Sequence, residues 1–178
     1  MLVSCAFFVA AMAASNSTHS QSAAGPRTCG ATLEPGEVLR RLNGVRNQGA
    51  VCHKSGGFVV AAPLRWSDRL AAVAAAQSRD MATLKQMRHR DMLDRALGER
   101  LAVGGYRFST AVENVAVGYA SLDEVVAAWL DSEDHCVNIM NGTVLELGLA
   151  CSEDATAPEP VEGRYWTLVL GAPPRSPR

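Results

Sequence analysis

The sequence predicts one domain of the α+β class, in which helices and strands are mixed in a layered fold. Its 178 residues match the length of a single domain. Residues 67–84 repeat apolar side chains at helical spacing, whereas residues 144–150 alternate them at strand spacing. No internal repeat and no strand–helix–strand rhythm is visible, which argues against a doubly wound parallel sheet.

The first half of the domain predicts two helices separated by a long loop. The first helix begins at Glu37 and places Val38, Leu42 and Val45 on one face. The second begins after Ser67, a favourable N-cap residue, and its apolar stripe is predicted to lie in the core. The loop over 47–63 is long for a compact domain, so we expect it to be functional or pinned.

The second half predicts shorter elements. A capping box at Ser121 and Glu124 starts one of the helices. Glu113 is unusual in an apolar strand, because burying its charge without a partner is costly, so it must lie on an exposed edge or be paired in a cleft. The predicted elements are a short helix over 93–102, a strand over 112–118, a helix over 121–130, and strands over 144–150 and 165–171.

The N-terminal segment predicts export. Residues 1–14 form an apolar run that ends in small residues and is too short to span a bilayer, so 1–24 is predicted to be a signal peptide and no transmembrane span is expected. Residues 25–36 are predicted to be a linker, 37–172 the folded domain and 173–178 a disordered tail. We expect a secreted or periplasmic protein, or a lipid-anchored one if translation starts upstream of Met1.

Cysteine count and charge narrow the class further. Removal of the signal peptide leaves Cys29, Cys52, Cys136 and Cys151, an even number that predicts two disulfides with three possible pairings. Four unpaired buried thiols are the alternative. The 17 basic and 18 acidic residues form no basic excess, and only 6% of residues are aromatic, so nucleic-acid binding is not expected.

Two histidines and one glutamate are the candidates for chemistry. His89 and His135 lie at ends of predicted elements, and Glu113 lies between them in sequence. Imidazole and carboxylate groups bind zinc and other divalent metals, and imidazole is also a general base near neutral pH. The sequence lacks the H-E-x-x-H and G-x-S-x-G motifs and a Gly-rich phosphate loop. The simpler alternative is a surface or capping histidine and an edge-strand charge.

An ordered set of motifs resembles the CAP superfamily, whose domain is also called the SCP domain, in its bacterial secreted form. The most specific is the W-L-x-S-x-x-H-C-x-N-I-M pattern over 129–140. Val112 replaces the usual Gly before Glu113, and Arg88 replaces the usual Ser before His89. The remaining matches are Leu42-Asn43 with Arg46, residues 62–66, residues 78–81, His89, residues 112–115, residues 146–148 and residues 165–167.

The resemblance implies an α-β-α sandwich with a surface cleft. It implies that His89, Glu113 and His135 line this cleft, where family members often bind zinc, and that Asn114 and Asn138 support its walls. It implies an acidic partner for His89, for which Asp94 is the first candidate. Asp91 and Glu133 are the others. It also implies that Cys52 pairs with Cys136, which leaves Cys29 for Cys151.

Three functions are compatible with these residues. The first is a non-enzymatic, monomeric binding module for a small lipid-like ligand, a divalent metal or a component of the cell envelope. The second is a metal-dependent hydrolase of peptide or cell-wall material, in which Glu113 acts as general base. The third is a structural interaction protein whose histidines and glutamate only stabilise the fold.

Overall fold

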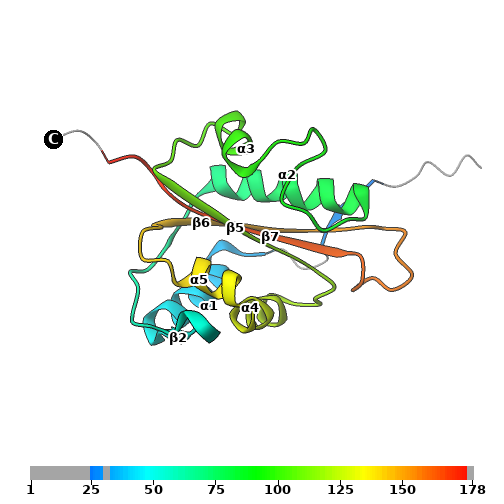
Figure 1. Ribbon diagram of the computed structural model, residues 1–178. Helices are drawn as coiled ribbons and strands as arrows, with labels where there is room; N and C mark the ends of the chain where they lie inside the picture. Colours follow the sequence, from blue (N-terminus) through cyan, green and yellow to red (C-terminus); the bar gives the residue numbers. More distant parts are fainter. Residues whose placement is uncertain (1–24, 30–32, 176–178) are drawn as a thin grey trace, which may run out of the picture.

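A computed structural model describes residues 25–29 and 33–175. The predicted signal peptide (1–24) and the end of the predicted tail (176–178) lie outside the described residues. The chain forms three layers, with a sheet between helices α2 and α3 on one face and helices α1, α4 and α5 on the other (Figure 1). The expected α-β-α sandwich is therefore confirmed.

The sheet is antiparallel apart from one short parallel pair. Its strand order is β1-β6-β7-β5, and β4 pairs in parallel with β6. Strand β5 lies at one edge of the sheet, next to β7. Its other long side is therefore beside helices and not beside another strand of the described residues. The strands are β1 (Arg27–Thr28), β4 (Arg65–Trp66), β5 (Thr110–Val117), β6 (Glu146–Glu153) and β7 (Arg164–Ala172).

The predicted linker over 25–36 is wrong in part. Arg27 and Thr28 pair with Glu153 and Ser152 at the end of β6, and Cys29 forms a disulfide with Cys151. Helix α1 also begins at Pro35, inside the predicted linker. A two-residue strand has no periodicity of its own, so only its long-range partner reveals it.

The helices follow the predicted starts, with one addition. Ser67 accepts a hydrogen bond from the Leu70 amide and Ser121 accepts one from the Glu124 amide, as N-caps do. The addition is α5, which no sequence pattern indicated. The helices are α1 (Pro35–Gln48), α2 (Asp68–Leu84), α3 (Leu97–Val103), α4 (Leu122–Asp131) and α5 (Glu133–Met140).

Helix α2 packs unusually close to the sheet at Gly148 of β6. A Cβ atom at Gly148 would lie 2.0 Å from the Ala71 amide nitrogen, so a side chain there has no room. The alanines of α2 permit the same approach from the helix side. This contact fixes the position of α2, and with it the segments that follow α2 at the cleft.

The long loop over 47–63 is pinned, as expected. It contains a short hairpin of β2 (Ala50–Val51) and β3 (Gly57–Phe58), with a 3-10 turn η1 (His53–Ser55) between them. The Cys52–Cys136 disulfide joins this loop to α5, with a Cα–Cα distance of 5.5 Å. Both implied pairings are thus confirmed.

Arg46 ties the same region from the other side. Its side chain is fully buried and donates four hydrogen bonds to the carbonyl oxygens of Ala62, Ile139 and Asn141. Burial lowers the pKa of its guanidinium. Arg46 thereby connects α1, the long loop and the end of α5 without any carboxylate partner among these contacts.

Candidate functional site

The site is built around Glu113 on edge strand β5. Its side chain is only 3% exposed, and both carboxylate oxygens accept from the Arg100 Nη2 atom, at 3.0 and 2.9 Å. Its Oε1 atom also lies 3.0 Å from Nδ1 of His89. Of the two possibilities for Glu113, the structure therefore has it buried and paired, although its strand lies at the sheet edge.

The backbone around His89 is held from two helices. Arg100 of α3 donates to the His89 carbonyl oxygen at 3.1 Å. Gln77 of α2 donates to the carbonyl oxygens of Arg88 and Arg90, at 2.7 and 3.4 Å. His89 is therefore fixed at its backbone, while its imidazole remains 60% exposed at the surface.

His135 reaches the site from α5, opposite His89. Asn114 donates to the His135 carbonyl oxygen at 3.0 Å, and Asn138 donates to the Asn114 side-chain oxygen at 2.9 Å. Asn138 also donates to the Glu113 carbonyl oxygen at 3.4 Å. These contacts join the first turns of α5 to β5, and the disulfide at Cys136 holds the same helix.

The two histidines have pKa values shifted in opposite directions. The hydrogen bond to Glu113 raises the pKa of His89, and burial opposes this shift without cancelling it. Burial lowers the pKa of His135, and the nearby charge on His89 lowers it further. Compared with an ordinary imidazole, the folded protein thus favours the charged form more at His89 and the neutral form more at His135.

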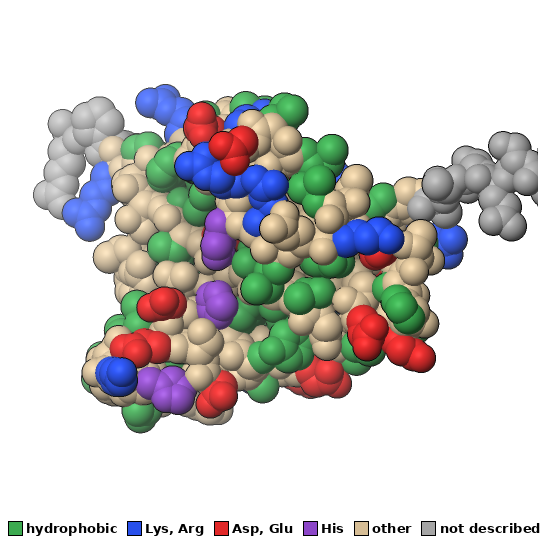
Figure 2. Space-filling view, turned by 45° about the vertical axis from the view of Figure 1, so that its right-hand side comes forward, with side chains coloured by type: hydrophobic (Ala, Val, Ile, Leu, Met, Phe, Trp, Pro, Cys, Tyr) green, Lys and Arg blue, Asp and Glu red, His purple; other side chains and the backbone are tan. Residues whose placement is uncertain are grey.

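An apolar groove of about 260 Å³ continues from His135 along β5 and α4. Figure 2 shows histidine side chains on this side of the molecule, with exposed hydrophobic side chains beside them. The indole nitrogen of Trp129 donates to the Val115 carbonyl oxygen, so the exposed edge of β5 is capped here. The groove is lined by Met87, Val115, Ala116, Val117, Tyr119, Ala128, Trp129, Ser132 and His135.

The three candidates for the acidic partner of His89 pair with other residues. Asp94 instead pairs with Arg88 and Arg90, at 3.2 and 3.5 Å, in a turn where its own φ is 60°. Asp91 pairs with Arg95, and Glu133 accepts a hydrogen bond from Ser55. The carboxylate that holds His89 is Glu113.

The described residues do not fit a resident metal ion. No group of three His, Cys, Asp or Glu side chains within 25–29 and 33–175 is placed to hold one. Glu113, the carboxylate in contact with His89, has both oxygens on Arg100. A divalent cation at this carboxylate would lie beside a buried positive charge and be repelled by it.

Two residues of the site, Arg100 and Gln77, were not predicted from the sequence. Both are polar residues on predicted helices, and helical periodicity alone does not separate a buried polar side chain from an exposed one. The available signal was Glu113 in an apolar strand, because its charge is costly to bury without a partner. Arg100 is one of many basic residues in this part of the chain, so the sequence did not identify which one.

A sheet between two helical layers, a pinned loop and an edge site with histidine and glutamate side chains define a domain of the CAP class. The profile of the Cysteine-rich secretory protein family (CAP) matches residues 39–170, and the chain belongs to this family. Two curated Bacillus subtilis proteins are similar in sequence: the uncharacterized protein YkwD, 31% identical over 105 residues, and the uncharacterized membrane protein YlbC, 33% identical over 88 residues.

These relatives are longer proteins. The matches cover 59% and 49% of this chain but only 38% of YkwD and 25% of YlbC. The chain therefore corresponds to one part of each relative.

Solved structures share the fold at low sequence identity. An extracellular SCP-domain protein from Bacillus anthracis is 23% identical with a TM-score of 0.57, covering 77% of this chain and 41% of its own. An outer surface protein from Borrelia burgdorferi is 18% identical with a TM-score of 0.61, covering 80% of this chain and 97% of its own. Within the part of the chain that the structure describes, no helix is long and apolar enough to cross a bilayer.

Proposed function

We propose that this chain is an exported binding module whose cleft takes a small lipid-like ligand. The apolar part of the ligand lies in the groove along β5 and α4, and its polar head lies at His89 and His135. The observation that carries the proposal is the continuity of the two surfaces, because His135 belongs both to the histidine pair and to the groove lining. Small-molecule sites commonly combine an apolar lining with a few polar groups that fix orientation.

Export to the cell envelope agrees with other features. Two disulfides join distant parts of the chain, over separations of 122 and 84 residues. Such bonds persist in oxidising compartments. Similar proteins are described as extracellular or outer-surface. Whether the chain is released or held by a lipid anchor is tested by fractionating cells that express it.

Binding of a dansyl-labelled fatty acid to the purified protein, and its displacement by the unlabelled fatty acid, tests the ligand class. We expect saturable binding that Ala128→Trp abolishes, because the indole would fill the groove. Ala127→Trp is the matched control, since Ala127 is the adjacent but exposed residue of α4. Binding that is equal in both variants would place the ligand elsewhere.

The head-group position has its own test. His135→Ala removes one polar contact and is expected to weaken binding about tenfold, the effect of losing one hydrogen bond to a charged group. The same change is expected to leave the unfolding midpoint close to that of the unmodified protein, because His135 is partly exposed. An unchanged affinity would exclude His135 from the ligand site.

A second candidate function is hydrolysis of peptide or cell-wall material. The observation that favours it is the neighbouring pair of histidines with opposite pKa shifts, which is the arrangement of an acid and a base. Turnover of peptides or peptidoglycan that Glu113→Gln abolishes would support it. Loss of that turnover with a chelator would show that a metal takes part. If the protein shows no turnover, the binding module is the proposal that remains.

A further inference from the structure

We infer that the Arg100 guanidinium serves as the cation of this site, bound to the Glu113 carboxylate in the place of a divalent metal. The inference concerns the electrostatics of the cleft, and it holds whether or not the ligand is lipid-like. Its basis is the contact pattern of Arg100, the burial of the pair and the arrangement of the two histidines.

Arg100 contacts the site through a single nitrogen of its side chain, Nη2. Nη2 contacts both oxygens of Glu113 and the carbonyl oxygen of His89, all within 3.1 Å. The other two nitrogens, Nε and Nη1, are buried and have no hydrogen-bond partner among the described residues. An arginine that only stabilised packing would be expected to use its whole donor set, as Arg46 does with four hydrogen bonds.

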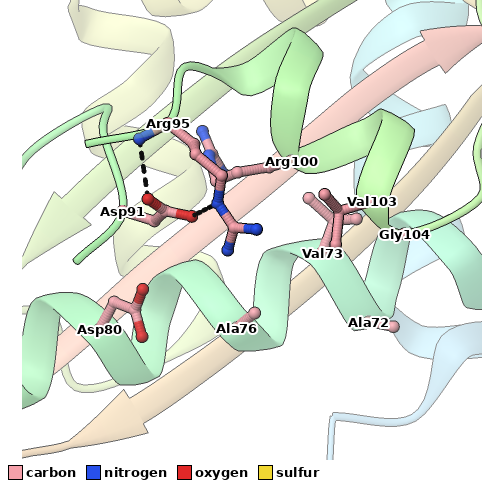
Figure 3. Close-up of a pocket in the computed structure, with 9 residues that line it drawn as sticks. All are labelled: Ala72, Val73, Ala76, Asp80, Asp91, Arg95, Arg100, Val103 and Gly104. Atoms are coloured by element: carbon pink, nitrogen blue, oxygen red, sulfur yellow. Dashed lines mark hydrogen bonds and ion pairs between the residues drawn. The ribbon is translucent and has the colours of Figure 1, made fainter. Parts of the chain in front are cut away.

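Arg100 enters between α2 and α3, away from the open face of the cleft. It lines a cavity of about 230 Å³ there, together with Arg95 and Asp91 (Figure 3). Arg95 pairs with Asp91 at 2.7 Å and is therefore not the partner of Glu113. Arg100 is thus the guanidinium that neutralises Glu113, and the side chains of both residues are at most 4% exposed.

This arrangement gives Glu113 a permanent counter-ion. A guanidinium keeps its proton at any physiological pH, whereas a metal must be acquired from solution. His89 is held against the same carboxylate through Nδ1. A divalent ion at the same carboxylate would have to displace Arg100 or lie next to its charge. Removing that charge should therefore open the Glu113 carboxylate, beside His89, to a divalent cation.

Zinc titration by calorimetry on the purified protein tests this inference. We expect the zinc affinity of Arg100→Gln to be at least about tenfold higher than that of the unmodified protein, in which zinc uptake should not depend on Glu113. The gained uptake should disappear in the double variant Arg100→Gln/Glu113→Gln. Arg100→Lys is the matched control, because it keeps a positive charge and should not gain zinc.

Three outcomes would overturn the inference. One is tight zinc binding by the unmodified protein that Glu113→Gln removes, and another is equal uptake by Arg100→Gln and Arg100→Lys. The third is a folded Arg100→Gln protein that gains no zinc. Circular dichroism checks folding, and if Arg100→Gln does not fold, Arg100→Met and Arg100→Lys provide the same contrast between an uncharged and a charged side chain. Fatty-acid displacement, measured separately, is independent of these outcomes.

Discussion

Two buried arginines, one on each side of the sheet, illustrate two uses of a buried charge. Arg46 lies with α1 and binds three carbonyl oxygens through four hydrogen bonds. Arg100 lies on α3 and binds one carboxylate and one carbonyl oxygen, with two nitrogens left unpartnered among the described residues. The first arginine connects backbone segments, whereas the second sets the charge and position of a surface site.

The difference shows what the cleft requires. Carbonyl oxygens are neutral and satisfy a guanidinium wherever the fold needs a cross-link. A buried carboxylate instead needs a cation, and the resulting pair can position a third group, here His89. Stability and site geometry should therefore respond differently when each arginine is changed.

The largest effect on stability is expected at Arg46. Arg46→Met leaves the carbonyl oxygens of Ala62, Ile139 and Asn141 without their donor in a buried region, which should lower the free energy of unfolding by about 4 kcal/mol. Urea denaturation measures this change. The NMR signals of His89 in the folded variant should stay in place, and a shift there would show that the two regions are coupled.

A smaller loss of stability is expected when Arg100 is changed. Arg100→Met leaves Glu113 buried without its counter-ion, at a cost of about 3 kcal/mol. The double variant Arg100→Met/Glu113→Leu should regain most of the lost stability in the same urea experiment, because it removes both charges. A double variant no more stable than Arg100→Met would contradict the proposed pairing.

The pH dependence of stability separates the two histidines. The pKa of His89 is raised in the folded state, so its stabilising contribution is complete below the unfolded pKa of about 6.5 and is lost as the pH rises through the folded value. The pKa of His135 is lowered, so its contribution is present above the unfolded value and is lost as the pH falls. The unfolding midpoints of His89→Gln and His135→Gln are each compared with that of the unmodified protein. As the pH falls through about 6.5, the midpoint of His89→Gln should drop below that of the unmodified protein, and the midpoint of His135→Gln should rise above it.

The smallest effect is expected in the exposed cluster of Arg88, Arg90 and Asp94. Asp94 is 75% exposed, so Asp94→Asn should change the free energy of unfolding by no more than about 0.5 kcal/mol. The change should shrink further in high salt. Thermal unfolding at two salt concentrations measures it, and a loss as large as that of Arg100→Met would give Asp94 a role that its contacts do not show.

Local patterns in the sequence were sufficient to predict most of the fold. Ser67 and Ser121 indicated where α2 and α4 begin, and the alternation over 144–150 indicated β6. Helix α5 was missed because residues 133–136 carry no apolar period and follow α4 after one residue, Ser132. Strands β1 and β4 were missed because two residues are too few for a pattern, and their pairing with β6 is long-range.

The site was predictable only as a set of candidates. The resemblance of the sequence to the CAP family indicated His89, Glu113 and His135, and the hydrogen bonds of Asn114 and Asn138 now connect β5 with α5. Asp94, the first candidate for the acidic partner, pairs with Arg88 and Arg90, and the carboxylate in contact with His89 is Glu113. Arg100 was missed because no local rule distinguishes a buried arginine from its exposed neighbours.

The pKa of His89, measured by NMR titration in three proteins, is the most direct test of the central claim that Arg100 and Glu113 together set the cleft electrostatics. The hydrogen bond and charge of Glu113 raise this pKa, and the charge of Arg100 lowers it. The account predicts the lowest pKa in Glu113→Gln, an intermediate one in the unmodified protein and the highest in Arg100→Gln. Equal values in the three proteins, or the reverse order, would contradict it.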